Sequence, residues 1–347
     1  MKQTRTQDIS INTQTGSAPA NGGAVPSVRP ERAFGGGLLP KAGILALLLG
    51  FPLGTSLLTA GEKPHPPQYR FTEIPLPGPG YALGINDNGL VTGIYTDPVT
   101  GDWYSFFIER GVLTTGISLS GAPITVLGPA NNRGVEIGNF GDDTDQQAVL
   151  YDVRKGKFTP LPEITGMPIN FGNSINDAGH AVGNAWEGGD FNNGGTGLEQ
   201  NWIWDGRDYN FFTLPVANQG VYSGGINNRD HVSGYYIDNV TGFPHGFLRD
   251  GPNFTTLDAP GAVYTLAFGI NNQGLVVGRW VGTDGGHHGY IWSQGNFVTV
   301  DTDISASLGG QWYGSNEHGD LAGNIWVTAE HIPSAVIAER VDEDCHK

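Results

Sequence analysis

The stretch Gly269-Ile270-Asn271-Asn272-Gln273-Gly274-Leu275-Val276-Val277-Gly278 decides the fold, because its pattern returns along the whole chain. An Asn is followed by Gly three positions later in five of six copies, and by Gly seven positions later in all six. The anchors are Asn86, Asn131, Asn176, Asn227, Asn271 and Asn316, which step by 45, 45, 51, 44 and 45 residues. A fixed period of this size is typical of propeller and solenoid arrays.

The composition fits many short strands joined by tight turns. The 347 residues include 55 Gly and 22 Pro, while 8 Trp, 16 Phe and 12 Tyr can supply an apolar core. The formal net charge of −16, with no basic patch, argues against nucleic-acid binding because such a surface repels phosphates. The single cysteine, Cys345, excludes an intramolecular disulfide and a C-x-x-C motif.

The N-terminal part predicts export. Residues 1–40 are polar and small, which predicts disorder. Residues 41–60 combine a positive residue, an apolar run and a small final residue, as an export signal does. An uncleaved membrane anchor is the alternative, since the run from Ala42 to Ala60 has 19 residues. Both predict a secreted, periplasmic or cell-surface protein that contacts a membrane only through residues 41–60, followed by a linker over 61–68.

Each repeat contains four candidate strands. In the fifth copy they are Tyr264–Ile270, Leu275–Val281, Gly289–Trp292 and Phe297–Val300. The last copy has only three, and the segment from Tyr69 to Gly78 resembles the missing fourth strand. We therefore predict an all-β protein. Residues 69–340 would form a six-bladed β-propeller of four-stranded blades, with the last blade closed by the N-terminal strand and a tail over 341–347. A right-handed β-solenoid is the alternative, but it would not need the supplied strand.

The repeated residues suit a hairpin that opens each blade. The Asn side chain can accept hydrogen bonds from the turn backbone, and the Gly three positions on suits a positive φ. Asp230 replaces that Gly in the fourth copy and tolerates the same conformation. The Gly seven positions after the anchor predicts a bulge or close packing by an aromatic ring of a neighbouring blade. The alternative is that the asparagines form a functional ring along a channel.

The copies also show a family resemblance. Ile-Asn-Asn-x-Gly-x-x-x-Gly followed by a His-Gly-aromatic triplet, here His245-Gly246-Phe247 and His288-Gly289-Tyr290, resembles the bacterial extracellular HAF-repeat family. The other copies depart from the triplet at Tyr104, Gln147, Asn201 and Ser334. The resemblance covers nearly all of residues 69–340 and implies an exported, propeller-like protein. It implies no reaction and no catalytic residues.

Aromatic residues are the candidates for ligand binding. In a propeller the loops between second and third strands and those entering each first strand share one face, opposite the Asn turns. Exposed rings among polar groups suit a saccharide, although packing between blades is the alternative. The candidates are Tyr81, Trp103, Tyr222, Tyr264, Trp312 and Tyr313. The insertion from Trp186 to Trp202 could add specificity.

Acids and histidines on the same face are the candidates for catalysis and metal binding. The catalytic candidates are Asp97, Asp238, His245 and His288. Asp142, Asp143 and Asp145 could contribute to a Ca²⁺ site, although they lack the spacing of a Ca²⁺ loop. The alternatives are that Asp begins a turn and that each His bonds to a loop backbone.

The sequence predicts an exported propeller that presents this face to a glycan, polymer or protein. A glycan-active hydrolase or lyase using the acidic and His residues is one alternative, and a structural scaffold is another. We expect no required cofactor, with Ca²⁺ as the only candidate, and a monomer. Propellers host all three kinds of function, so the fold does not choose between them.

Overall fold

The computed structural model describes residues 66–142, 144–187, 199–216, 218–304, 307–327 and 332–341. All 24 named elements in these ranges are β-strands. The predictions for residues 1–40, 41–60 and 342–347, for residues 61–65 of the linker and for residues 188–198 of the insertion lie outside the described residues. Within the described ranges there is no helix long and apolar enough to cross a membrane.

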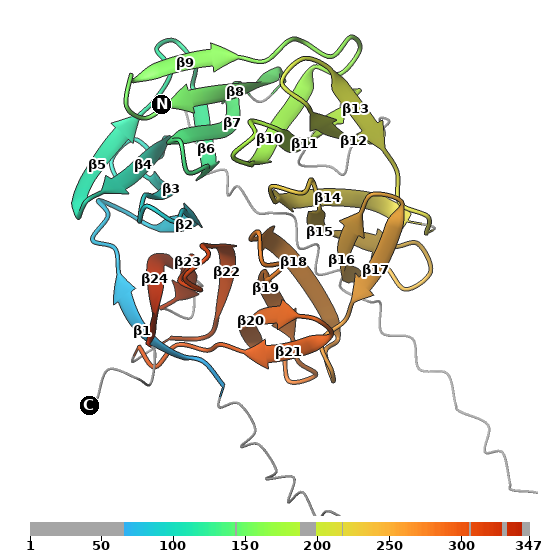
Figure 1. The fold of residues 1–347 in the computed structure, drawn as a ribbon. Helices are drawn as coiled ribbons and strands as arrows, with labels where there is room; N and C mark the ends of the chain where they lie inside the picture. Colours follow the sequence, from blue (N-terminus) through green and yellow to red (C-terminus); the bar gives the residue numbers. More distant parts are fainter. Residues whose placement is uncertain are drawn as a thin grey trace, which may run out of the picture. The chain divides into compact units, whose positions relative to one another are not determined.

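Each of the six repeats contributes four strands, arranged from the centre of a ring outwards (Figure 1). Repeats 1 to 3 hold β2 (Gly80–Ile85), β3 (Val91–Thr96), β4 (Trp103–Glu109), β5 (Val112–Ile117), β6 (Ile124–Ala130), β7 (Val135–Gly141), β8 (Gln146–Asp152), β9 (Lys157–Pro160), β10 (Ile169–Ile175), β11 (Ala181–Trp186), β12 (Glu199–Trp204) and β13 (Tyr209–Phe212). Repeats 4 to 6 hold β14 (Asn218–Ile226), β15 (Val232–Asp238), β16 (Pro244–Asp250), β17 (Asn253–Leu257), β18 (Tyr264–Ile270), β19 (Val276–Val281), β20 (His287–Ser293), β21 (Asn296–Thr299), β22 (Gly310–Ser315), β23 (Leu321–Trp326), β24 (Pro333–Val341) and β1 (Gln68–Glu73).

The strands form a β-propeller, but not six separate blades. Hydrogen bonding gives four separate four-stranded sheets and one eight-stranded sheet that joins repeats 2 and 3. The join is a parallel pairing of Ile169 with Gln146, where the Gln146 amide donates to the Pro168 carbonyl at 2.9 Å. The prediction of six separate blades is wrong for this reason: the edges of two neighbouring sheets approach closely enough to share a hydrogen bond.

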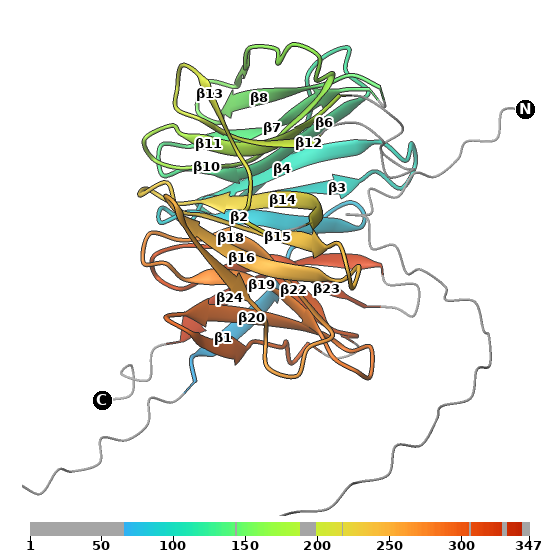
Figure 2. The ribbon, with the colours of Figure 1, turned by 90° about the vertical axis from the view of Figure 1, so that its right-hand side faces the viewer.

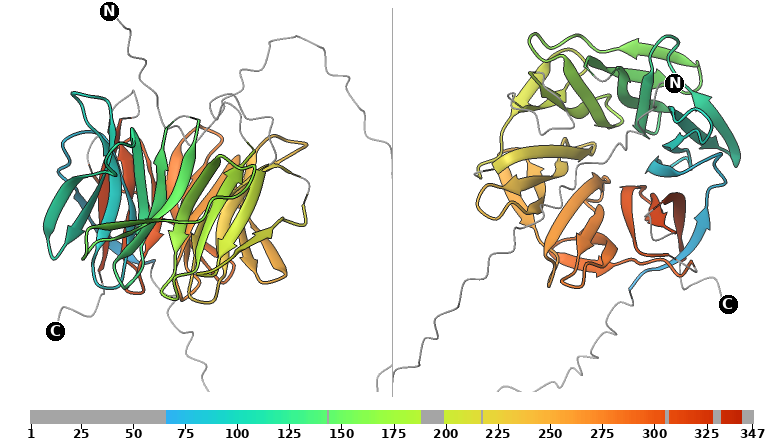
Figure 3. Two further views of the ribbon diagram at one scale, coloured as in Figure 1. Left: turned by 90° about the horizontal axis from the view of Figure 1, so that it is seen from above. Right: turned by 180° about the vertical axis from the view of Figure 1, so that it is seen from behind.

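The ring closes as predicted. Strand β1 pairs antiparallel with β24, from Gln68 opposite Val341 to Glu73 opposite Val336, so the N-terminal strand completes the last sheet. Figure 2 shows the sheets of neighbouring repeats from the side, and Figure 3 shows the turns gathered at the two ends of the ring. Closure leaves no unpartnered sheet face at the start or end of the array.

The Gly seven positions after each Asn is required by its own repeat. A Cβ at any of the six would lie within 2.1 Å of a carbonyl oxygen on the first strand. At Gly93, Gly183, Gly234 and Gly278 it would also lie within 2.8 Å of an aromatic ring on the third strand of the same repeat. The prediction of a neighbouring blade's ring is therefore wrong. The predicted bulge is not at this Gly either. In each repeat it lies in the first strand, just before the anchor Asn.

One buried side chain conflicts with its surroundings. Glu136 in β7 is 1% exposed, and neither carboxyl oxygen has a hydrogen-bond partner among the described residues. Burial raises the pKa of the Glu136 carboxyl well above its usual value. The other repeats place apolar residues at this position, namely Val91, Ala181, Val232, Val276 and Leu321.

Replacing Glu136 with Val should stabilise the fold by about 2 kcal/mol, the scale of burying a polar group without a hydrogen bond. Because the folded-state pKa is raised, stability from the bound proton is full below the unfolded-state pKa and is lost as pH rises through the folded-state pKa. The stability gap between Glu136→Val and wild type should therefore widen from pH 5 to pH 8. Urea unfolding at both pH values measures this. Glu163→Val, at an exposed glutamate, is the control and should show no widening.

Candidate functional site

The two ends of the ring axis differ in chemistry. We call the end at the Asn-x-x-Gly hairpins the turn end, and the opposite end, where the loops enter the first strands, the loop end. At the turn end each anchor Asn organises its own hairpin. The Asn271 Oδ1 accepts the amides of Gln273 at 3.1 Å and Leu275 at 2.9 Å. Five repeats make both of these hydrogen bonds. The third repeat makes the one from the amide four positions after its Asn, which is the His180 amide. The residue three positions after Asn has a positive φ, +83° at Gly274 and +58° at Asp230, as predicted.

The same asparagines also link the repeats into a closed ring. Each Nδ2 donates to the backbone carbonyl of the anchor Asn in the next repeat. The bonds run from Asn86 to Asn131 at 2.8 Å, Asn131 to Asn176 at 2.9 Å, Asn176 to Asn227 at 2.9 Å, Asn227 to Asn271 at 3.1 Å, Asn271 to Asn316 at 2.9 Å and Asn316 to Asn86 at 3.4 Å. All six asparagines are buried. We call this set the Asn ring.

A second closed ring follows from the next residue of each repeat. Its backbone amide donates to the side-chain oxygen of the equivalent residue in the following repeat, at 2.6–2.9 Å. Its members are Asp87, Asn132, Asp177, Asn228, Asn272 and Glu317. Both rings line a central cavity of about 90 Å³ at the turn end. The Asn ring thus lines a cavity, but its polar groups are bound to the protein itself.

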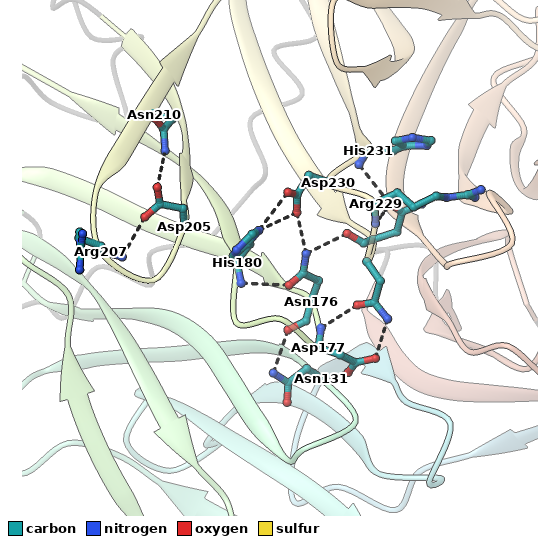
Figure 4. A network of polar contacts seen from close by, with 12 residues as sticks. Asn131, Asn176, Asp177, His180, Asp205, Arg207, Asn210, Arg229, Asp230 and His231 are labelled. Atoms are coloured by element: carbon teal, nitrogen blue, oxygen red, sulfur yellow. Dashed lines mark hydrogen bonds and ion pairs between the residues drawn. The ribbon is translucent and has the colours of Figure 1, made fainter.

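Figure 4 shows how the third and fourth repeats adjust this network. Asp230, which stands where the other repeats have Gly, accepts a hydrogen bond from the Asn176 Nδ2 at 2.8 Å. The His180 Nδ1 lies 3.0 Å from both oxygens of Asp230. This contact adds a bridge between the two repeats. The hydrogen bonds at the turn end therefore stabilise the contacts between repeats, and the Nδ2 donors of the Asn ring are all bound to backbone carbonyls.

Aromatic side chains of four repeats contact one another in a continuous series. Successive ring contacts connect Trp103 to Tyr81 (6.4 Å between centroids), Tyr81 to Tyr313 (6.2 Å), Tyr313 to Phe268 (4.8 Å), Phe268 to Tyr235 (6.2 Å) and Tyr235 to Tyr222 (5.2 Å). These six residues, the aromatic belt, come from repeats 1, 6, 5 and 4. Four of them keep part of their surface exposed: Trp103, Tyr81, Tyr222 and Tyr235. Rings with an accessible face can stack on a ligand.

The tyrosine hydroxyls of the belt act on one another electrostatically. Burial raises the pKa of Tyr313 well above its usual value, the hydroxyls of Tyr81, Tyr222 and Tyr235 raise it further, and Arg279 lowers it. Electrostatic interactions of this kind require proximity. Burial also raises the pKa of Tyr222 to about 12. The belt therefore presents neutral hydroxyls, which can donate and accept hydrogen bonds.

Two charged groups adjoin the belt. Arg279 in β19 is 6% exposed, and its charge lowers the pKa of Tyr235 and Tyr313, although burial raises both overall. Glu199, at the start of β12, accepts hydrogen bonds at 3.3 Å from the Val221 amide and the Asn184 side chain. Burial raises the pKa of Glu199 to about 7 despite these bonds. An acid with this pKa can exchange a proton near neutral pH.

The structure gathers four of the six predicted ligand-binding residues into the belt. Trp312 does not join them. It is 1% exposed, stacks on Phe71 at 6.0 Å and donates its Nε1 hydrogen to the Val300 carbonyl, so it belongs to the core between repeats. Tyr264 begins β18 and is only partly buried, but it makes none of the belt's ring contacts.

The predicted catalytic residues are held by contacts within their own repeats. Asp97 in repeat 1 and Asp238 in repeat 4 each accept two backbone amides at 2.7–3.0 Å from the loop that follows, and these bonds lower the pKa of both carboxyls. His245 and His288 each pair with an Asp of their own repeat, Asp258 at 2.8 Å and Asp301 at 2.7 Å. Turn formation and local cross-linking therefore occupy these four side chains.

The predicted Ca²⁺ residues form a turn. The Asp142 Oδ1 accepts the amides of Thr144 at 2.7 Å and Asp145 at 3.0 Å, which lowers the pKa of Asp142. Asp143 lies outside the described residues. Across the ranges that the structure covers, no three His, Cys, Asp or Glu side chains are grouped so that they could hold a metal ion.

Several solved structures of low sequence identity resemble this chain, whose own strand pairing shows its fold. The chain is a β-propeller. It is 12% identical to the β-propeller domain of the Trilobed protease from Pyrococcus furiosus, covering 75% of this chain and 81% of that one with a TM-score of 0.47. A gluconolactonase from Xanthomonas campestris is 11% identical, with 80% and 95% covered and a TM-score of 0.49. The lectin of Aleuria aurantia, solved with a fucosylated sugar, is 12% identical, with 75% and 95% covered and a TM-score of 0.42. No family model and no curated protein matches the chain. Likeness this distant indicates nothing about ligand or activity.

Sequence reasoning missed Arg279, Glu199, Phe268 and Tyr235. Aligning the six repeats position by position identifies Arg279. Eight residues after the anchor, the other repeats carry Ile94, Asn139, Asn184, Tyr235 and Asn324, so Arg279 is the single cation at that position. Glu199 is likewise the only acid at the start of a third strand.

Proposed function

We propose that this is an exported β-propeller that binds a glycan at the aromatic belt. Export rests on the apolar segment over residues 41–60 and on the HAF-repeat resemblance. Glycan binding rests on one observation above all: six aromatic residues from four repeats are linked ring to ring, and four keep exposed surface. Flat rings stack on the C–H faces of sugars, while hydroxyls and amides bind the sugar hydroxyls.

Trp103→Ala tests this proposal. We expect removal of this exposed ring to weaken glycan binding about tenfold, equivalent to about 1.4 kcal/mol. Calorimetric titration of the full-length chain with a panel of neutral and acidic oligosaccharides measures the affinity. Trp280→Ala is the matched control, because Trp280 stacks on His288 at 4.3 Å and bonds to Thr299 on the outermost strand of its repeat, outside the belt. Binding that Trp103→Ala leaves unchanged would place the site elsewhere.

A second candidate function is a glycan-active enzyme, and Glu199 is the observation that favours it. Its carboxyl, with a pKa of about 7, could act as a general acid or base beside the belt. Assaying the same oligosaccharide panel for product release separates the two functions. Products that disappear in Glu199→Gln while binding persists would support the enzyme. Retention of glycan with no products supports a binding protein.

A further inference from the structure

Arg279 is a buried cation without a partner of opposite charge among the described residues. It is 6% exposed, and its Nε is completely covered without a hydrogen-bond partner. No hydrogen bond or ion pair joins its guanidinium to another residue in the described ranges. Its contact there is the face of Trp326, 5.5 Å from the ring centroid. A cation–π contact compensates only in part for the water that a buried guanidinium loses.

The surroundings of Arg279 are aromatic and neutral. Strand β19, which carries Arg279, packs against β22, which carries the belt residue Tyr313. The charge of Arg279 acts on Tyr313 and on Tyr235, a second member of the belt. The carboxyl of Glu199 also acts on Tyr235, whose pKa it raises while Arg279 lowers it. Glu199 does not pair with Arg279, however, because it accepts hydrogen bonds from the Val221 amide and the Asn184 side chain. The guanidinium therefore keeps hydrogen-bond donors that no described residue uses.

An unpaired buried cation is unexpected in this chain, because Asp and Glu outnumber Lys and Arg by 34 to 18. Carboxylates are therefore in excess over cations, yet none of the described ones pairs with Arg279. A guanidinium presents a planar fork of donors that matches a carboxylate in a bidentate manner. An anionic group brought by the ligand would satisfy it and remove the desolvation penalty of the free protein.

The geometry points to an acidic sugar as the ligand. We propose that the glycan carries a uronic acid unit, with its ring on the aromatic belt and its carboxylate on Arg279. This inference rests on the proposed glycan binding. The net charge of −16 repels a densely charged polymer, so the acidic unit is expected to be an isolated one within an otherwise neutral oligosaccharide.

The test uses matched pairs of oligosaccharides that differ only at C6 of one sugar, which is a hydroxymethyl group in one member and a carboxylate in the other. Calorimetric titration of the full-length chain should show the acidic member binding at least about tenfold more tightly, or about 1.4 kcal/mol. Arg279→Gln should remove this preference, so that the two members of each pair bind with equal affinity. Arg249→Gln is the matched control, since Arg249 also lies over an aromatic ring, 4.7 Å from the Phe212 centroid, but outside the belt.

Each outcome is decisive. Equal affinity for the two members of every pair in the wild-type chain overturns the inference and leaves glycan binding standing, and this result does not depend on any variant folding. A preference that persists in Arg279→Gln also overturns it. If no member of any pair binds, glycan binding at the belt fails together with the inference.

Discussion

Gly278→Ala is expected to lower the free energy of unfolding by about 3 kcal/mol, the upper part of the usual range for overpacking a core. The added Cβ would lie 2.0 Å from the Leu266 carbonyl oxygen and 2.8 Å from the Tyr290 ring. Leu266 is held opposite Arg279 in the pairing of β18 with β19, so its carbonyl cannot move without breaking the ladder. Urea unfolding of the full-length chain measures the loss.

Gly285→Ala is the control for this substitution. Gly285 has a φ of +81°, and a Cβ there would meet no atom within 4 Å. Its replacement should cost only the backbone strain of a left-handed residue, about 1 kcal/mol. If Gly278→Ala proved no more destabilising than Gly285→Ala, the close approach of the Leu266 carbonyl and the Tyr290 ring would not be what requires glycine.

Asn271→Ala is expected to destabilise the fold by a similar amount. The side chain is 5% exposed and makes three hydrogen bonds, with the amides of Gln273 and Leu275 and with the Asn316 carbonyl. At about 1 kcal/mol for each bond, the loss is about 3 kcal/mol. Thermal and urea unfolding of the full-length chain measure this loss.

Two further variants separate the roles of Asn271. Asn271→Asp keeps the oxygen that caps the turn and loses the donor to Asn316, so its stability should lie between wild type and Asn271→Ala. Gln273→Ala removes only an exposed bond to Glu317 and should cost well under about 1 kcal/mol. Equal losses in Asn271→Asp and Asn271→Ala would mean that the link between repeats, and not the turn, carries the whole effect.

The candidate site was only partly predictable. Tyr81 and Trp103 could be placed at the loop end because they lie at the start of a first and a third strand, whereas Tyr222 and Tyr313 lie in the middle of first strands. Trp312 could not be told from them, since alternation along β22 decides whether a ring faces the belt or the core. The position of Asp97 and Asp238 on the predicted ligand face makes them candidates for catalysis, but in the structure both cap the loops that follow them.

The sequence by itself determined the period, the strands of each repeat, the positive φ at Gly274 and Asp230, and the pairing of β1 with β24. These features depend on hydrogen bonds and side-chain alternation within about ten residues, or on the match between the two chain ends. The tertiary structure alone decided the fused sheet of repeats 2 and 3, the two closed rings at the turn end and the meeting of Arg279 with the aromatic belt. Those contacts join residues more than 20 positions apart in neighbouring repeats, and only the curvature of the closed array brings them together.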